Sequence, residues 1–298
     1  MLDFSNSKIL IVGDVMLDKY YFGKVDRISP EAPVPIVNIQ KEESRLGGAS
    51  NVANNIVSLG GHSLLCGVIG HDLFGKEIER ISRHKNIDTF LLKTSSPTIT
   101  KARIIGGKQQ IVRVDYEDKS ELNADNKKLF RDTISRILPE YDILVISDYG
   151  KGLISEDLCR YLIKLAHKYD KKVIIDPKGK NWEKYSGADI VTPNVKELSD
   201  IVGYTVPNTD RAIEKAAREA ITNNHLTALL VTRSDKGMSL IGPIPPIHIP
   251  THSEEVFDVS GAGDTVVATL GLCLAAGFEI SEAMRTANIC LLYTSDAA

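Results

Sequence analysis

Short apolar segments rich in β-branched residues alternate along this chain with amphipathic helical patterns, and this alternation restricts the fold more than any other feature. Lys8–Val15 (KILIVGDV) ends in Gly-Asp, as expected of a buried parallel strand. Similar segments recur at Ser63–Ile69, Asp142–Ser147, Lys172–Asp176, Asp189–Thr192 and Ala228–Thr232. Helical patterns separate most of them and cover Leu73–His84, Asn126–Leu138, Ser155–Tyr169, Thr209–Asn223, Ala262–Ala276 and Ser281–Ile289. We therefore predict an α/β fold with a mainly parallel central sheet covered by helices on both faces.

In an open sheet of this kind, ligands bind outside the carboxyl ends of the strands. The residues at the predicted strand ends are polar, and they are Asp14, Asp148, Asp176, Asn194 and Thr232. We therefore expect the functional site along this edge of the sheet.

Two segments interrupt the alternation. Tyr20–Gln40 carries three prolines and alternating polar and apolar residues, whereas Thr98–Glu117 reads as two strands around a turn at Gly106-Gly107. Together they are expected to form a small antiparallel sheet standing off the main one, over residues 16–40 and 98–117. A small sheet with one apolar face needs a cover. We therefore expect it to act as a lid over a site, as a homodimer contact, or as both.

Composition argues against several classes of partner. The formal net charge is only −3 and the basic residues are scattered, so nucleic acid is not expected to bind. The N-terminus lacks the blocks of a signal peptide, and no apolar run approaches the ~18 residues of a membrane span. The four cysteines lie far apart without metal or disulfide spacing, which suits a reducing cytosol. We expect a cytoplasmic protein whose 298 residues form a single domain.

The strongest chemical signal is the turn Asp258–Thr265 (DVSGAGDT), which precedes an apolar helical pattern. Glycines allow several backbone N–H groups to approach a ligand, and a helix N-terminus favours an anion. We predict that Gly261, Ala262 and Gly263 cradle a phosphoryl group and that Asp264 accepts a proton from a hydroxyl nucleophile. On local grounds, a glycine-rich helix start with a capping aspartate is an equal alternative.

A second glycine signal, Gly47-Gly48, is followed by Asn51 at the start of another helical stretch. The glycines allow close approach of a ligand, and Asn51 offers donors and acceptors suited to sugar hydroxyls. Asp14 can accept hydrogen bonds from two such hydroxyls. The alternatives are a helix N-cap for Asn51 and an ordinary turn residue for Asp14. Neither a G-x-G-x-x-G fingerprint nor a Walker loop occurs, so a dinucleotide or P-loop site is not expected.

Asn194 and Glu197 lie three residues apart at a predicted helix start, where both oxygens face the same way. Such a pair suits a hydrated Mg²⁺, although a capping box explains the same spacing. On the lid, Lys101 and Arg103 suit a substrate that already carries a phosphate. The alternative for these two cations is an ordinary solvated surface.

Taken in order, these motifs resemble the ribokinase-like, or PfkB, family of sugar kinases. The resemblance runs from about Lys8 to Asn288 and rests on five motifs: Gly47–Asn51, Gly67–Gly75, Asn194–Glu197, Thr232–Gly237 and Gly261–Asp264. It implies a three-layer αβα sandwich with a small β lid. It also implies ATP and Mg²⁺ as cofactors, with Asp264 as the catalytic base and the Gly261–Asp264 amides as the anion hole.

The resemblance also assigns ligand-binding positions. The sugar side comprises Asp14, Gly47, Gly48, Asn51, Lys101, Arg103 and Asp148. The nucleotide side comprises Lys178, Asn194, Thr232, Ser234, Gly237, Gly261, Gly263 and Asn288, with Asn194 and Glu197 supporting the metal.

Within the family, stretches such as Ile28–Pro35 (ISPEAPVP) and Ser147–Gly152 (SDYGKG) resemble the branch that acts on a heptose 7-phosphate. The implied reaction phosphorylates the anomeric hydroxyl of D-glycero-β-D-manno-heptose 7-phosphate, a step in ADP-heptose and lipopolysaccharide core synthesis. A kinase for another sugar or nucleoside, or a sugar-phosphate sensor without catalysis, remain alternatives.

The C-terminus departs from the family pattern. After Asn288 the chain reads ICLLYTSDAA, where relatives continue with small residues and a final helix beside the adenine pocket. We expect residues 289–298 to be non-native or truncated, which would leave one wall of the adenine site incomplete. The transferase domain of bifunctional relatives is not expected in this chain.

Overall fold

The computed structural model describes residues 2–251 and 261–295, with side chains up to residue 290. Residues 258–260 of the glycine-rich turn and 296–298 of the tail lie outside this description. The main sheet of the described chain has nine strands in the order β13-β12-β11-β10-β9-β8-β1-β4-β5. From β11 to β5 in this order, all neighbouring strands run parallel. At the opposite edge, β12 pairs antiparallel with β11 and β13 pairs antiparallel with β12.

The strand bounds follow the predicted segments closely. The predicted strands are β1 (Lys8–Gly13), β4 (His62–Gly70), β8 (Ile143–Ser147), β9 (Lys172–Asp176), β10 (Ile190–Val191) and β11 (Ala228–Thr232). Strands that the sequence reading missed lie at the two edges of the sheet, namely β5 (Asp88–Thr94), β12 (Met238–Ile241) and β13 (Ile247–Ile249).

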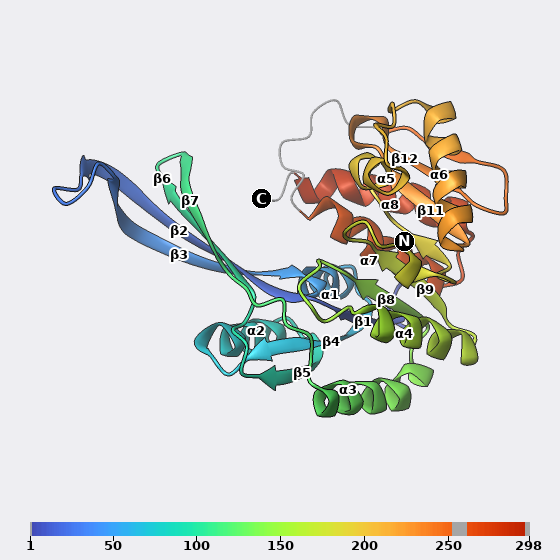
Figure 1. The fold of residues 1–298 in the computed structure, drawn as a ribbon, viewed down its shortest axis with the longest axis horizontal. Coiled ribbons are helices and arrows are strands. Elements are labelled where there is room, and N and C mark those ends of the chain that lie inside the picture. Colours follow the sequence, from blue (N-terminus) through green and yellow to red (C-terminus); the bar gives the residue numbers. More distant parts are fainter. Residues whose placement is uncertain (1, 252–260, 296–298) are drawn as a thin grey trace.

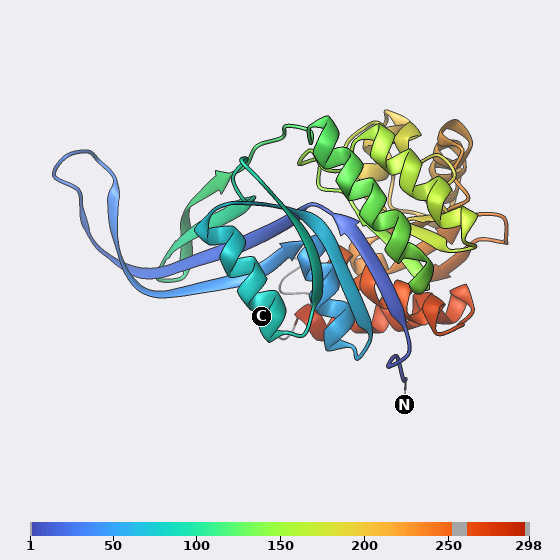
Figure 2. The ribbon, with the colours of Figure 1, turned by 90° about the horizontal axis from the view of Figure 1, so that it is seen from below.

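The apolar strands are buried on both faces because helices cover both. In β1, Ile9 and Ile11 belong to one apolar core, whereas Leu10 and Val12 belong to the core on the opposite face. The first face is covered by α1 (Ala49–Ser58), α2 (Leu73–His84), α7 (Ala262–Ala275) and α8 (Ile280–Ser295). The second is covered by α3 (Ala124–Ile137), α4 (Glu156–Lys168), α5 (Val195–Val202) and α6 (Asp210–Asn224). Figure 2 shows the green and red helices on opposite sides of the strands, as the predicted three-layer sandwich requires.

Three short 3-10 helices complete the described chain: η1 (Leu138–Glu140), η2 (Glu183–Tyr185) and η3 (Ser234–Lys236). None of the helices in residues 2–251 and 261–295 is long and apolar enough to cross a membrane.

A second sheet of four strands projects from the body of the molecule (Figure 1). Its strands are β2 (Val15–Ile28), β3 (Pro35–Gly48), β6 (Thr100–Gly106) and β7 (Gln109–Tyr116), in the order β3-β2-β6-β7. The expected antiparallel arrangement is wrong for the central pair, because β2 and β6 both begin next to the main sheet and therefore run parallel. The β6–β7 hairpin turns at Gly107 as expected. The β2–β3 hairpin is longer than expected, since β3 continues from the lid into the body and delivers Gly47 and Gly48 to the start of α1. We refer to these four strands as the lid.

Candidate active site

A cleft of about 740 Å³ lies where the lid meets α1 and the start of α7. Lid residues form one side, including Asp18, Tyr20, Arg45, Lys101 and Arg103. The lining also includes Gly47 and Gly48 at the end of β3, together with Asn51, Asn54, Tyr149, Gly261 and Asp264 of the body. Five predicted sugar-side positions and the predicted base therefore line one cleft, although together they span more than 200 residues of the chain.

Asp264 lies in the first turn of α7, at the base of this cleft. Gly261 precedes the helix in the left-handed conformation with φ 82°, and a Cβ there would lie 2.9 Å from the Asn51 side-chain nitrogen. The first backbone N–H groups of a helix have no acceptor within it. The N–H groups of Ala262 and Gly263 are therefore available to an anion, and Gly263 is exposed.

Two neutral donors hold the Asp264 carboxylate. The Asn51 amide donates to Oδ2 at 2.7 Å, and the Tyr149 hydroxyl donates to Oδ1 at 2.7 Å. The carboxyl is only 4 % exposed, and burial raises its pKa from 3.8 to about 6 even though both hydrogen bonds lower it. A carboxylate with a pKa near the working pH is suited to accept a proton in catalysis.

Asp176 at the end of β9 is a second carboxyl near the base. Burial raises its pKa well above the ordinary value, and the negative charges of Asp264 and Glu197 add to the effect. Because the charges of both carboxylates act on Asp176, the predicted base and Glu197 of the nucleotide side lie near the same end of β9.

Asp14 uses its carboxylate within the protein. It is 2 % exposed and accepts backbone N–H groups of Tyr149 at 2.8 Å and Lys151 at 3.0 Å. A longer contact of 3.4 Å comes from the N–H of Leu153. Burial nevertheless raises the pKa of Asp14. Its carboxylate thus holds the loop after β8, and its predicted contact with sugar hydroxyls stays a prediction.

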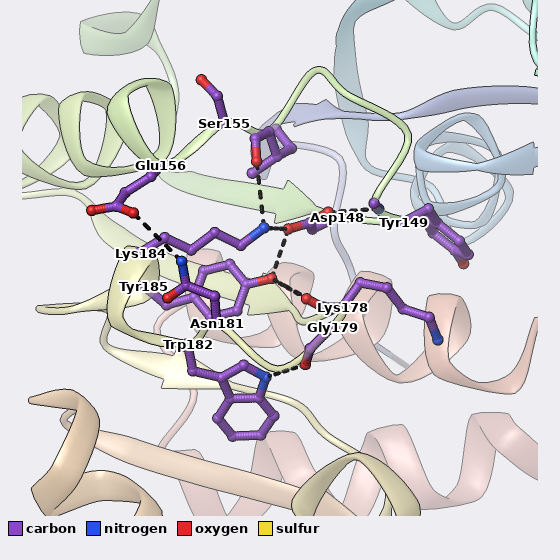
Figure 3. A network of polar contacts seen from close by, with 12 residues as sticks. Asp148, Tyr149, Ser155, Glu156, Lys178, Gly179, Asn181, Trp182, Lys184 and Tyr185 are labelled. Carbon is purple, nitrogen blue, oxygen red and sulfur yellow. Dashed lines mark hydrogen bonds and ion pairs between the residues drawn. The ribbon is translucent and has the colours of Figure 1, made fainter. Parts of the chain in front are cut away.

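The Asp148 carboxylate is also held by contacts within the protein, in the network that Figure 3 shows. Its Oδ2 pairs with the Lys184 amine and accepts the Tyr185 hydroxyl at 2.7 Å, while Oδ1 accepts the Gly150 N–H at 2.8 Å. Asp148 is 2 % exposed and does not line the cleft. Asp148 therefore lies apart from the five predicted sugar-side residues that line the cleft, and η2 supplies its carboxylate with a cation and a hydroxyl.

Two lid arginines flank the ring of Tyr20. The guanidinium groups of Arg103 and Arg45 lie 5.1 and 5.0 Å from the ring centre of Tyr20. Arg103 also pairs with Asp18 at 2.6 Å. The Lys101 amine lies 5.7 Å from the ring centre of Tyr149, and burial lowers its pKa. Arg45 was not among the residues predicted for this cluster.

On the nucleotide side, the capping box that the spacing allowed is present. Asn194 caps α5 by accepting the Glu197 N–H at 2.8 Å, and Glu197 accepts the Asn194 N–H at 3.1 Å. The other oxygen of Glu197 pairs with Lys178 at 3.0 Å. In the described part of the chain, no group of three or more His, Cys, Asp or Glu side chains could hold a metal ion.

The remaining nucleotide-side positions lie along the carboxyl edge of β10 and β11. Thr232 ends β11 and forms a bridge to Asn194. Ser234 begins η3 and Gly237 follows its end, with φ angles of 56° and 76°. Asn288 lies on α8, buried, and donates to the Pro250 carbonyl at 2.8 Å. Its side chain thus supports the end of β13, and its predicted contact with a nucleotide stays a prediction.

Sequence reasoning missed Tyr149 and Lys184 as site residues. Tyr149 follows Asp148 directly within the SDYGKG stretch, so its position beside a strand end was a usable signal. Lys184 lies in a segment without a local motif, and its role depends on a contact with a residue 36 positions earlier.

Comparison with known proteins agrees with the fold. The bifunctional protein HldE of Haemophilus influenzae (strain PittEE) is 45 % identical over 289 residues, which cover 96 % of this chain and 60 % of that protein. The chain thus spans about three fifths of such bifunctional relatives. The D-beta-D-heptose 7-phosphate kinase of Bordetella bronchiseptica is 44 % identical over 285 residues, covering 95 % of this chain and 89 % of that protein.

Solved structures support the fold. The tetrameric inhibited form of phosphofructokinase-2 from Escherichia coli has a TM-score of 0.82 at 20 % identity, with 98 % of this chain and 95 % of that chain covered. Arabidopsis thaliana ribokinase complexed with ribose and ATP has a TM-score of 0.72 at 20 % identity, with coverages of 95 % and 90 %. The pattern of the pfkB family carbohydrate kinases matches residues 6–290. The chain is therefore a member of the pfkB family of carbohydrate kinases.

Proposed function

We propose that this chain transfers the γ-phosphoryl group of ATP to the anomeric hydroxyl of D-glycero-β-D-manno-heptose 7-phosphate. The product would be heptose 1,7-bisphosphate, used in ADP-heptose and lipopolysaccharide core synthesis. The 44 % identical relative from Bordetella bronchiseptica is named for a heptose 7-phosphate kinase, and the resemblance covers nearly the whole chain.

The observation that carries the proposal is Asp264 at the start of α7, within a cleft lined by lid cations. The carboxylate can take the proton of the attacking hydroxyl, because its pKa of about 6 leaves it ionised at neutral pH. The N–H groups of Ala262 and Gly263 face the place where negative charge develops on the transferred group. Base and anion hole thus come from a single helical turn.

The acceptor's own phosphate has suitable partners at the lid end of the cleft. Three cations line the cleft there: Arg45, Lys101 and Arg103. The two arginines flank the ring of Tyr20. Guanidinium groups bind phosphate oxygens in pairs, and burial from water strengthens the interaction. We infer that this cluster selects a phosphorylated sugar over a free one.

We propose that ATP and Mg²⁺ bind at the carboxyl ends of β10 and β11. Asn194 and Glu197 offer the hard oxygen ligands that Mg²⁺ prefers, and a largely hydrated Mg²⁺ needs only one or two of them. When bound, the metal would neutralise charge on the phosphoryl oxygens. Lys178 would hold the nucleotide phosphates, with Thr232, Ser234, Gly237 and Asn288 around the nucleoside.

A coupled assay of ADP release tests the proposal. Purified protein would receive ATP and Mg²⁺ with one acceptor at a time: the β and α anomers of heptose 7-phosphate, ribose, fructose 6-phosphate and adenosine. We expect turnover with the β-heptose 7-phosphate at least tenfold above the others. Turnover with a different acceptor would refute the substrate and keep the kinase.

An Asp264→Asn variant tests the assigned base. General-base catalysis contributes about 10²–10⁴-fold, so kcat should fall by at least about 100-fold while calorimetric binding of the sugar phosphate persists. A variant that binds both ligands and retains kcat would contradict the assignment. Binding of sugar phosphate by the parent without ADP release would instead favour a sensor.

We also propose that the lid pairs with a second copy of the chain. Its exposed apolar side chains, Val25, Ile28, Val34, Ile39, Val112 and Val114, would otherwise remain in water. A molar mass of two chains by light scattering would support a homodimer, and a mass of one chain would refute it.

A further inference from the structure

The catalytic carboxylate predicted above is held by a residue that no sequence motif assigned. Tyr149 lies in the loop after β8, and its hydroxyl is 2.7 Å from Oδ1 of Asp264. The opposite oxygen is held by Asn51 of α1 at the same distance. Three separate elements therefore meet at one carboxylate, and each of its oxygens has one donor.

The tyrosine hydroxyl is restricted to donating in this pair. Burial raises the pKa of Tyr149 far above its ordinary value, and the negative charge of Asp264 raises it further. The phenol therefore stays protonated and cannot compete with Asp264 as a base. A carboxylate has about four lone-pair sites. Two remain open after the Asn51 and Tyr149 contacts, so the carboxylate can still receive the proton of an acceptor hydroxyl.

The loop that carries Tyr149 is fixed by two buried carboxylates. Asp14 accepts the N–H groups of residues 149, 151 and 153, and Asp148 accepts the N–H of Gly150. Gly150 and Gly152 have φ angles of 65° and 108°, which side-chain-bearing residues rarely adopt. In Figure 3 the Tyr149 ring points away from the Asp148 network. The two predicted sugar ligands thus serve to aim this ring at Asp264.

We propose that Tyr149 is a positioning residue for the phosphoryl-transfer reaction: its hydroxyl fixes the rotamer of Asp264 and keeps that carboxylate ionised. This inference rests on the proposed function of Asp264 as the base. The physical basis is that a buried carboxylate with one donor removed loses both a directional restraint and a stabilising contact to its charged form.

The test is Tyr149→Phe, with Tyr161→Phe as the matched control. Tyr161 lies on α4, where its hydroxyl meets only a carbonyl oxygen of Arg131 at 3.5 Å. Because protonated Asp264 cannot act as a base, activity falls as the pH drops through its pKa. Tyr149→Phe should move this acid limb of kcat upward by about one pH unit and lower kcat about tenfold, with KM values within twofold. The control should keep the parent profile.

A second readout does not depend on the substrate. The carboxyl carbon of Asp264 can be titrated by ¹³C NMR in ligand-free protein, with the resonance assigned from Asp264→Asn. We expect its pKa to be higher in Tyr149→Phe than in the parent. An unchanged NMR titration would overturn the proposal even if kcat fell. If the parent does not turn over the heptose phosphate, the substrate assignment fails, and the NMR titration still decides the role of Tyr149.

Discussion

Replacing Asp264 by asparagine should change how the stability of this protein depends on pH. In the folded chain the pKa of Asp264 is raised from 3.8 to about 6 because the carboxyl is buried. Between these two values, the folded state binds more protons than the unfolded state. The free energy of unfolding therefore falls as the pH rises through this window. The raised pKa corresponds to a loss of about 3 kcal/mol that is complete above the folded pKa.

Urea unfolding of the parent and Asp264→Asn at about pH 4 and about pH 8 measures this linkage directly. The variant has no ionisable group at this position and does not show this loss. Between the two pH values, the free energy of unfolding of the parent should therefore fall by about 3 kcal/mol more than that of the variant. Asp176 shifts the result in the same direction, because its raised pKa depends partly on the Asp264 charge.

The matched control is Asp132→Asn, which removes an exposed carboxylate from α3. Its free energy of unfolding should change with pH by the same amount as that of the parent across the same pH range. If Asp264→Asn also runs parallel to the parent, within about 1 kcal/mol, Asp264 is not an ionised buried carboxylate and the assigned base is refuted.

Three further substitutions test separate contacts. Lys184→Met leaves the buried Asp148 carboxylate without its cation, and urea unfolding should show a loss of about 3–5 kcal/mol; a loss below 1 kcal/mol would contradict the network. Gly261→Ala puts a Cβ 2.9 Å from the Asn51 amide at a left-handed φ, so kcat should fall at least tenfold with the melting temperature lowered only slightly. Arg103→Met should raise the KM for a phosphorylated sugar about tenfold or more and leave the KM for ATP unchanged, whereas equal effects on both would argue against a phosphate contact.

The helices and parallel strands of the core were predictable because their patterns are local. β1, β8, β9 and β11 are continuous apolar runs, and the predicted α2 begins and ends at the residues observed. Two of the three missed strands, β5 and β13, are edge strands, and β12 lies next to β13. β5 has no fully buried residue, and β12 and β13 are short, so their strand conformation depends on pairing with neighbours.

The residue types of the site were also readable from local sequence. The glycine-rich turn before an apolar helix predicted an anion cradle with an adjacent carboxylate, and the structure has Asp264 at the base of a cleft beside Asn51. Gly47 and Gly48 line that cleft as expected. These features depend on backbone conformation within a few residues, and the sequence determines such conformation directly.

Only the tertiary structure decided which polar groups face the cleft and which hold the loop. Asp14 and Asp148 end neighbouring strands, and from sequence each was as good a sugar ligand as Asn51. In the folded chain, Asp14 binds backbone N–H groups some 135 residues later, and Asp148 binds Lys184 of η2. A buried carboxylate is costly unless it has hydrogen-bond donors, and here the donors come from distant parts of the chain. The sequence by itself therefore determined the family and the layers and predicted Asp264 as the base, and long-range packing determined which side chains hold the Asp264 carboxylate.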